Sequence, residues 1–445
     1  MKRILVLGAG RSSSSLIRYL LDNALTFDWT VTVGDVSLDH ARRNIGPDER
    51  GRAVEFDINN PELTRLIIGE SDIVISLLPP AFHPLVALRC LDAGKDFLTA
   101  SYVSDELMEL DAAARRRGLL FLNECGLDPG IDHLSAMKVI DGIRNRGGLI
   151  TAFESFTGGL IAPETDPENP WRYKFTWNPR NVVTAGQTTA RYLHNGKPKY
   201  IPYQQLFRRI TPVHVPGYGD YEGYANRDSL KYIATYGLDG ISTMLRGTLR
   251  NKGFCSAWNI LVQLGCCEDT YQMTGVSAMT HADFLDSFLP PVANCNNVQE
   301  KICMHFGLTS SAREIDMLQW SGFFEHVSIG LKAGTPAQIL EHILSKKWSL
   351  NPGDKDQIVM WHRFNYSIEG HGREIQASLV ATGANDVSTA MARTVGLPLG
   401  IATKLITENS IRARGVVIPT TAEFYQPILK ELETFGITLS EVDVR

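Results

Sequence analysis

The chain has 445 residues, of which 44% are hydrophobic and 21% charged, and its formal net charge is −5. This length exceeds what one hydrophobic core usually supports, so two or three domains are expected. The composition is that of a globular protein, and the small net charge without a Lys/Arg run argues against nucleic acid or an anionic membrane as a partner. We therefore expect a small-molecule ligand.

The N-terminal segment MKRILVLGAG has an apolar stretch too short for a signal peptide, and no apolar run is long enough to span a bilayer. We expect a cytoplasmic protein. The seven cysteines contain no CxxC pair, so they predict neither a zinc site nor a disulfide framework. Most of them are expected to be small buried side chains, and no bound metal is expected.

Residues 1–126 alternate short apolar runs with helical stretches, the pattern of parallel strands joined by crossover helices. Their nearly continuous apolar character is typical of a sheet covered on both faces. Six strands are predicted, reading RILVLG, WTVTVGD, AVEFD, DIVISLLP, DFLTAS and LLFLNECG. The fold class is α/β, with a doubly wound Rossmann-type sheet whose ligands bind at the carboxyl ends of the strands.

From residue 127 onward aromatic residues, Pro and Gly become frequent, and LITAFESFTGG and KDQIVMWHRFNYSIEG read as strands among helices. This predicts an inserted mixed α+β domain over residues 127–388. The segment VSTAMARTVGLPLGIATKLI is apolar at three- and four-residue spacing and predicts a helix that packs on the first domain. Residues 389–445 would then return to the dinucleotide-binding domain of residues 1–126.

The sequence GAGRSSSS follows the first strand directly and predicts a loop that binds a pyrophosphate. Gly8 suits the tight turn, and Gly10 lets the backbone approach the phosphates at a helix N-terminus. Ser13 stands where the third glycine of the motif would be, and it is small enough for close helix packing. The chain is therefore predicted to be a nicotinamide-dependent oxidoreductase.

Asp35 ends the second predicted strand, where a carboxylate can accept hydrogen bonds from the adenosine ribose and repel a 2′-phosphate. This favours NAD over NADP. The alternative is a turn residue or a cap for the helix that begins near Ser37. The loops at Leu77 to Pro80 and Ala100 to Tyr102 follow the fourth and fifth strands and are expected to line the cofactor and substrate site.

Asp128 precedes Pro129, a residue type favoured at the first helical position, so Asp128 is a plausible helix N-cap as well as a site residue. His133, one turn later, is expected to be a packed or hydrogen-bonded histidine. Downstream, NRDS (226–229) and RGTLR (246–250) place arginines among small polar residues, where guanidinium groups can bind carboxylates bidentately.

Seven segments in order along the chain together resemble the saccharopine dehydrogenase family of the glutamate-forming type. They are SYVS, GLDPGIDH, GGLIAPE, NPWRYKFTWNPR, GYANRDS, RGTLR and IPTTAEFYQPIL. The resemblance implies a dinucleotide-binding domain with an inserted α+β domain that binds saccharopine and forms a homodimer. It implies reversible oxidation of saccharopine to an imine, which water resolves into glutamate and 2-aminoadipate 6-semialdehyde.

Carried over by position, the resemblance implies that saccharopine contacts Ser101, Tyr102, Asp128, Thr157, Arg227, Thr248, Leu249 and Arg250. Tyr102 and Asp128 are the candidates for moving protons on the amine and the attacking water. The three carboxylates of saccharopine suit Arg227 and Arg250. The expected dinucleotide-binding residues are Gly8, Gly10, Arg11, Ser12, Ser13, Asp35, Asp57, Leu77, Leu78, Pro79 and Ala100.

The chain departs from the fungal members of this family at two positions. They have an arginine after the second strand and a cysteine before the GG of the GGLxAPE motif, where this chain has Asp35 and Thr157. The first difference favours NAD and the lysine-degrading direction. The second leaves no thiol for acid–base work there, although Thr157 can still hold a carboxylate or a water.

Two other functions stay open from the sequence. One is a dehydrogenase for another carboxylated secondary amine, such as a carboxylated polyamine, but the NRDS and RGTLR regions lack the acidic cluster that a distal amine requires. The other is a non-catalytic protein that binds a dinucleotide. The presence of Tyr102, Asp128, Arg227 and Arg250 together argues against that role.

Overall fold

The computed structural model describes residues 1–185, 187–295 and 297–444, which form two compact units. The first unit contains Met1–Ile150, Ser367–His371 and Leu379–Glu441. The second contains Thr151–Tyr366, Gly372–Ser378 and Val442–Arg445. The C-terminal segment thus lies mainly in the first unit, and the first boundary falls 24 residues after the one expected at 126.

The first unit is built on a seven-stranded sheet whose strands all pair in parallel. The spatial order is β15-β6-β5-β4-β1-β2-β3, so the direction of progression reverses between β1 and β4. This confirms a doubly wound Rossmann-type sheet. The strands are β1 (Lys2–Leu7), β2 (Trp29–Asp35), β3 (Gly51–Glu55), β4 (Ile73–Ser76), β5 (Asp96–Thr99), β6 (Leu120–Leu122) and β15 (Gly415–Val417).

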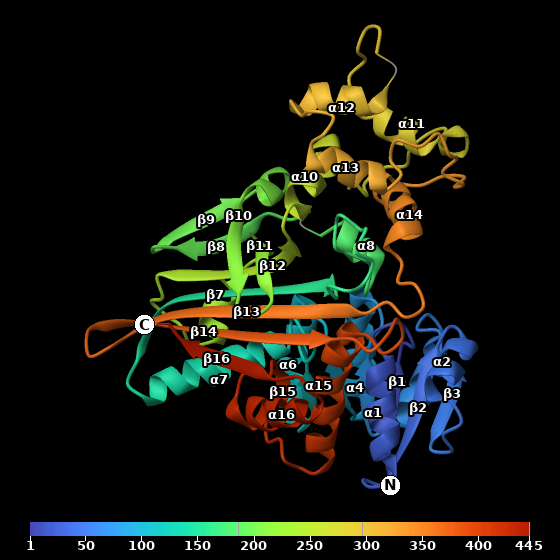
Figure 1. The fold of residues 1–445 in the computed structure, drawn as a ribbon. Helices are drawn as coiled ribbons and strands as arrows, with labels where there is room; N and C mark the ends of the chain where they lie inside the picture. The colour runs from blue at the N-terminus through green and yellow to red at the C-terminus, as the bar shows by residue number, and fades with distance from the viewer. Residues whose placement is uncertain (186, 296, 445) are drawn as a thin grey trace. The chain divides into compact units, whose positions relative to one another are not determined.

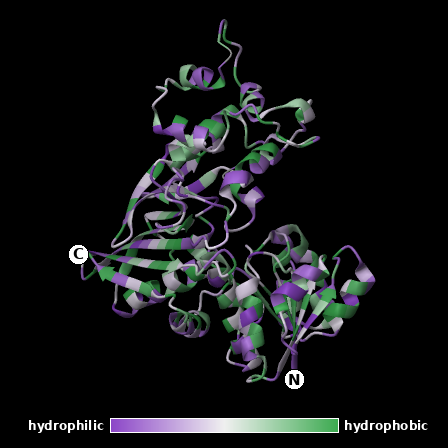
Figure 2. Ribbon diagram, turned by 45° about the vertical axis from the view of Figure 1, so that its right-hand side comes forward, coloured by the Kyte–Doolittle hydropathy of each residue, from purple (hydrophilic) through white to green (hydrophobic). Residues whose placement is uncertain are grey.

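Helices connect these strands, and all of them except the short η1 contain buried residues. Figure 2 shows both hydrophobic and hydrophilic residues along the helices, as expected of helices that cover a sheet. One buried cluster of the sheet and its helices includes Leu7, Phe56, Val74, Phe97 and Phe121. The helices are α1 (Ser14–Ala24), α2 (Leu38–Ile45), α3 (Pro61–Gly69), η1 (Pro80–Phe82), α4 (His83–Ala93), α5 (Asp105–Met108), α6 (Asp111–Arg116), α7 (Ile131–Asn145), α15 (Ala390–Thr407) and α16 (Ala422–Thr434).

Helix α15 packs directly on α1 and confirms the predicted helix of the C-terminal segment (Figure 1). The two helices approach closely because α15 presents glycines to α1. A Cβ atom on Gly396 would lie 2.7 Å from the backbone nitrogen of Leu16, and one on Gly400 would lie 2.5 Å from the Tyr19 ring. The close contact between α1 and α15 therefore depends on the two glycines of the C-terminal segment.

The second unit contains most of a nine-stranded mixed sheet, with the order β10-β11-β12-β7-β13-β14-β16 and with β8 and β9 off this path. The predicted strands at LITAFESFTGG and KDQIVMWHRFNYSIEG are confirmed as β7 and β13. The strands are β7 (Leu149–Ile161), β8 (Ala190–His194), β9 (Lys197–Ile201), β10 (Ile210–Val215), β11 (Gly219–Ala225), β12 (Thr243–Asn251), β13 (Asp356–Ile368), β14 (His371–Thr382) and β16 (Leu439–Asp443).

Helices of the second unit surround a cluster of buried aromatic side chains. Trp348 lies 5.2 Å from Trp171, 5.0 Å from Tyr173 and 5.8 Å from Trp258, measured between ring centroids. The helices are α8 (Pro179–Val183), η2 (Tyr203–Arg208), α9 (Tyr232–Thr235), α10 (Phe254–Leu264), η3 (Val276–Ala278), α11 (His281–Asp286), α12 (Val298–Phe306), α13 (Arg313–Trp320) and α14 (Pro336–Trp348).

The sequence missed one strand of the first sheet. All six predicted strands are present, but β15 has only three residues and so shows no readable periodicity. It joins the sheet because Val416 donates its N–H to Asp111 and its strand pairs with β6. All seven cysteines are free, and every one except Cys303 is buried.

The close approach of α15 to α1 gives a stability prediction. We expect Gly396→Ala to lower the free energy of unfolding by about 1–3 kcal/mol, because the new methyl group would force the two helices apart. Gly142→Ala is the matched control, since Gly142 lies in α7 and a Cβ atom there meets nothing within 4 Å. That control is expected to be neutral or stabilising by about 0.5–1 kcal/mol. Urea denaturation measures both, and an equal effect at the two positions would contradict the packing argument.

Candidate functional site

The glycine loop after β1 leaves its backbone open at the carboxyl edge of the first sheet. Gly8 donates its N–H to Gly34 O at 2.8 Å and adopts a φ of 99°. A Cβ atom there would lie 3.0 Å from the carbonyl oxygen of Leu77, so glycine is required. Gly10 is exposed, and a Cβ atom on it would meet nothing within 4 Å. The space beside Gly10 fits the approach of a phosphate group.

The carboxylate of Asp35 is held against this loop by two backbone groups. It accepts the Ala9 N–H at 2.7 Å and the Ser37 N–H at 2.9 Å, and its side chain is 14% exposed. Ser37 in turn is the N-cap of α2. Asp35 therefore fixes a negative charge at the end of β2, and it also supports the turn into the next helix.

The other predicted dinucleotide residues differ in exposure. Ser13 is buried and donates its hydroxyl to Gly10 O at 2.7 Å, so it stabilises the loop from within. Asp57 is exposed, and its carboxylate accepts two hydrogen bonds from Asn59 at 2.9 Å. Arg11 and Pro79 are exposed, whereas Ser12, Leu77, Leu78 and Ala100 are partly buried.

Two of the predicted site residues of the first unit contact each other. The hydroxyl of Tyr102, in the loop after β5, donates to Asp128 Oδ1 at 3.1 Å. The alternative role of Asp128 as a helix N-cap is wrong, because α7 begins at Ile131 and its N-cap is Gly130. Pro129 is likewise not the first helical residue. Gly130, whose φ is 146°, closes a turn against Gly126 before the helix begins.

A buried polar group that the sequence did not single out as a site lies behind the Tyr102 loop. Glu124 is fully buried, and its Oε1 accepts the Val103 N–H at 3.1 Å. Its Oε2 lies 2.9 Å from His133 Nε2, and Asp132 Oδ2 lies 3.6 Å from His133 Nδ1. His133 is thus a hydrogen-bonded core histidine, as expected. The sequence does not reveal this buried cluster, because none of its residues differs in type from the polar residues of an ordinary surface.

His83 is the other buried polar residue beside this loop. It begins α4 and is 1% exposed. Its Nδ1 lies 3.0 Å from Ser76 Oγ, and its Nε2 lies 2.8 Å from Ser101 Oγ. Burial lowers the pKa of His83 to about 4. The imidazole is therefore neutral near pH 7.

In the second unit, Thr157, Thr248 and Arg250 lie on one face of the mixed sheet. Thr157 of β7 pairs in register with Thr248 of β12, and Arg250 is two residues further along β12. Leu249 points to the opposite face by the alternation of a strand and is fully buried, so only its backbone is available to a ligand. Thr157 Oγ1 is buried without a hydrogen-bond partner among the described residues.

Arg250 is a buried cation surrounded by aromatic rings. It is 5% exposed, and its guanidinium carbon lies 4.9 Å from the ring centroid of Tyr173 and 5.2 Å from that of Phe254. Burial raises the pKa of Tyr173 to about 12, so that ring supplies no charge near pH 7. Within the described part of the chain, no carboxylate oxygen lies within 4 Å of Arg250, and its Nε has no hydrogen-bond partner.

One carboxylate does lie in register with Arg250 across the β11–β12 pair. It belongs to Glu222, whose oxygens accept the N–H groups of Gly253 at 2.7 Å and Cys255 at 3.0 Å. Glu222 therefore satisfies the N-terminus of α10 instead of the arginine. Among the described residues, Arg250 therefore faces aromatic rings and the carbonyl oxygen of Leu249, to which its Nη1 donates at 2.9 Å, and no carboxylate.

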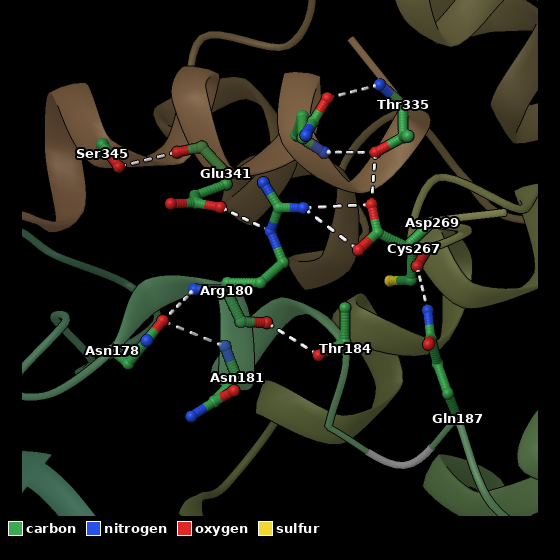
Figure 3. Close-up of polar contacts among 11 residues, drawn as sticks. Asn178, Arg180, Asn181, Thr184, Gln187, Cys267, Asp269, Thr335, Glu341 and Ser345 are labelled. Atoms are coloured by element: carbon green, nitrogen blue, oxygen red, sulfur yellow. Dashed lines mark hydrogen bonds and ion pairs between the residues drawn. The ribbon is translucent and has the colours of Figure 1, made fainter. Parts of the chain in front are cut away.

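Two other cations of this unit, Arg180 and Lys174, are paired with carboxylates. Arg180 donates to Asp269 at 3.0 Å and to Glu341 at 2.7 Å, and Asp269 also accepts from Thr335 (Figure 3). Lys174 is fully buried, but its ammonium group lies 3.0 Å from Asp166 and 2.7 Å from Asp354. These contacts are structural, and they show by contrast that the surroundings of Arg250 are unusual.

The NRDS and RGTLR segments lie side by side. Arg246 donates its backbone N–H to Ser229 Oγ at 2.9 Å, and Asn226 donates to Arg246 O at 2.9 Å. Arg227 is exposed and has a φ of 52°. Arg246, which was not among the predicted site residues, is buried, and its guanidinium carbon lies 4.0 Å from the Tyr232 ring centroid. Buried guanidinium groups on one strand can bind acidic groups of a ligand.

No helix in the described residues is long and apolar enough to cross a membrane. Two family models together match nearly the whole chain. The saccharopine dehydrogenase NADP binding domain matches residues 4–122, and the saccharopine dehydrogenase C-terminal domain matches residues 126–437. The chain therefore belongs to the saccharopine dehydrogenase family.

Similar proteins differ in how much of their length is matched. The bovine mitochondrial alpha-aminoadipic semialdehyde synthase is 34% identical over 98% of this chain, but the chain spans only 47% of that protein. Saccharopine dehydrogenase [NADP(+), L-glutamate-forming] from Saccharomyces cerevisiae is 31% identical over 100% of this chain and 99% of its own length. The chain thus spans about half of its mammalian relatives and nearly all of the yeast protein.

Solved structures give the same fold. Apo saccharopine dehydrogenase (L-Glu forming) from Saccharomyces cerevisiae matches with a TM-score of 0.88, 30% identity and full coverage of both chains. A homospermidine synthase from Legionella pneumophila in complex with NAD matches with a TM-score of 0.53 and 12% identity, over 99% of this chain and 91% of its own. The second match shows a shared fold only. The first confirms the Rossmann-type domain with an additional α+β domain.

The buried state of His83 gives a prediction about pH. Its pKa is lowered from 6.5 to about 4. Between these values the unfolded chain binds a proton that the folded chain does not, so the free energy of unfolding falls as the pH falls through this window. We expect His83→Gln to remove this contribution, which amounts to at most about 1.4 kcal/mol per pH unit. Urea denaturation at pH 7, 6 and 5 compares the two proteins, and equal pH slopes would contradict the prediction.

Proposed function

We propose that this chain catalyses the reversible, nicotinamide-dependent oxidation of saccharopine at its secondary amine. The products would be glutamate, 2-aminoadipate 6-semialdehyde and the reduced dinucleotide. Membership of the saccharopine dehydrogenase family and the match to the yeast enzyme over its full length support this reaction. The observation that carries the substrate assignment is the buried guanidinium of Arg250, which has no carboxylate partner among the described residues.

The surroundings of Arg250 favour a ligand carboxylate. A buried cation without an anionic partner is costly, and a bidentate carboxylate would compensate it. Thr157 and Thr248 lie on the same face, and the unpartnered hydroxyl of Thr157 can donate to the same carboxylate or to a bound water. Saccharopine carries three carboxylates, so Arg227 and Arg246 are further candidates for contacts. Leu249 would take part only through its backbone.

Tyr102 and Asp128 are the proposed acid–base pair of the first unit. The secondary amine must be neutral before a hydride leaves the adjacent carbon, so a nearby carboxylate that accepts its proton assists the reaction. Asp128 can accept that proton, and its hydrogen bond from Tyr102 orients it. Once Asp128 has released this proton to solvent, it can accept the proton of the water that attacks the resulting iminium and return it to the departing amine nitrogen. The bound dinucleotide supplies the hydride acceptor.

For the dinucleotide, we propose NAD. The charge of Asp35 is fixed beside the glycine loop, where it would accept ribose hydroxyls and repel a 2′-phosphate. The fungal relatives carry NADP(+) in their names, so this chain would differ from them in its preference. The cytoplasmic location, the homodimer and the domain limits expected from the sequence stay predictions.

Initial rates with L-saccharopine test the reaction and the cofactor together. We expect kcat/KM to be higher with NAD than with NADP. Asp35→Asn keeps an oxygen that can accept the Ala9 N–H but removes the charge, so it should raise kcat/KM with NADP by about tenfold. A wild-type preference for NADP would refute the argument from Asp35. Absence of turnover with either dinucleotide would refute the saccharopine assignment and direct the search to carboxylated polyamines or a binding role.

Substitution of Arg250 separates ligand binding from folding. Arg250→Met is expected to raise the KM for saccharopine at least about 30-fold, because one charge-assisted contact is lost. Its effect on the free energy of unfolding should be small, since the lost ring contacts are offset by relief of an uncompensated charge. Lys174→Met is the matched control and should destabilise the fold by about 3 kcal/mol by leaving two acidic partners unpaired. If both variants destabilise equally, Arg250 has a structural role.

A further inference from the structure

The loop at residues 101–103 is fixed at both ends by buried side chains. At its start, Ser101 Oγ lies 2.8 Å from His83 Nε2. At its end, the Val103 N–H donates to Glu124, which is held by His133. Between these two anchors, Tyr102 projects its hydroxyl to Asp128. The direction of the Tyr102 side chain therefore depends on how the residues on either side of it are held.

His83 is suited to be the first of these anchors because both of its ring nitrogens are used. Nδ1 lies 3.0 Å from Ser76 Oγ, at the last residue of β4, and Nε2 also lies 3.3 Å from Thr99 Oγ1, at the last residue of β5. The ring thus links the ends of two neighbouring strands to the loop. Rotation of the ring would break the contact at Nδ1, so the position of Nε2 is set by the sheet.

The environment of the ring also favours a holding role over proton transfer. Hydroxyl groups lie at both nitrogens, and a neutral imidazole donates at one nitrogen and accepts at the other. Either tautomer can therefore be satisfied, because a hydroxyl can turn to donate or to accept. The ring is 1% exposed.

We propose that His83 is a positioning residue for the reaction: it fixes Ser101 and thereby the direction of Tyr102 toward Asp128. The kinetic part of this inference rests on the proposed function. The structural part, that the side chain at position 83 orders the loop, does not depend on any substrate.

Two substitutions at the same position separate the two contacts of the ring. The amide of His83→Gln reaches about as far as Nε2 and can hydrogen-bond Ser101, but it loses Ser76. The shorter amide of His83→Asn reaches about as far as Nδ1 and can hydrogen-bond Ser76, but it loses Ser101. Both variants place an amide in the same buried site, so each serves as the control for the other.

Hydrogen exchange of the amides at residues 101–103, measured on the full chain, is the first readout. We expect faster exchange in His83→Asn and nearly wild-type exchange in His83→Gln, with helices far from the loop unchanged in both. This result would support the proposal even if saccharopine were not the substrate. Equal exchange in the two variants would overturn it.

Steady-state kinetics are the second readout. Loss of one hydrogen bond to an ordered loop corresponds to a change of about two- to tenfold, so His83→Asn should raise the KM for saccharopine by that factor. His83→Gln should recover most of this loss, and the KM for the dinucleotide should stay unchanged in both variants.

A double substitution tests whether His83 acts through Ser101. In a Ser101→Ala background, His83→Asn should have little further effect. Additive effects of these two substitutions would overturn the assignment of His83 as acting through Ser101. Failure of the proposed function would be recognised separately, because the wild-type chain would then show no turnover.

Discussion

The reversal of strand order between β1 and β4 is the constraint on which the first unit depends. Since all seven strands are parallel, their carboxyl ends meet at one edge, and the connections after neighbouring strands leave the sheet together there. The glycine loop follows β1, and the Tyr102 loop follows β5. Gly8 lies against the carbonyl group of Leu77, which follows β4. The residues that form the candidate site are thus gathered by topology, although they are far apart in sequence.

In the second unit, the buried and partly buried cations differ in whether carboxylates compensate their charge. Arg180 and Lys174 each lie between two carboxylates, which satisfies their charges within the fold. Arg250 is more buried than Arg180 yet has aromatic rings where those carboxylates would be. This difference is what the proposed carboxylate ligand of Arg250 would require. Binding sites commonly retain groups that do not serve stability.

The sequence predicted most of the fold because parallel strands and amphipathic helices leave periodic patterns. It predicted six of the seven strands of the first sheet and the packing of α15, but three residues were too few to reveal β15. The helix-cap alternative for Asp128 failed because the motif suggested Pro129 as the helix start, whereas Gly130 closes a turn first. The turn at Gly130 thus prevents Pro129 from taking the first helical position, which proline usually favours.

Pairings between distant residues could not be read from the sequence. The family pattern singled out Ser101, but nothing near it in the chain indicates that His83 holds it. Their contact forms because the first residue of α4 lies beside the loop that follows β5. The segments NRDS and RGTLR both drew attention for their arginines, but the sequence does not show that Arg246 is buried and Arg227 exposed. Arg227 has a positive φ and lies just after β11, whereas Arg246 lies within β12.

Asp35, to which we assign the proposed dinucleotide preference, also has a structural role in the loop. One carboxylate oxygen holds the Ala9 N–H of the glycine loop, and the other accepts the N–H of the N-cap of α2. Both hydrogen bonds need acceptor oxygens at the distance from the backbone that an aspartate side chain provides. A basic residue at this position would leave the N–H groups of Ala9 and Ser37 without these acceptors. A basic residue at position 35 would therefore disturb the loop as well as remove the negative charge. Asparagine separates the two effects better, because it loses the charge and keeps one of the two acceptor oxygens.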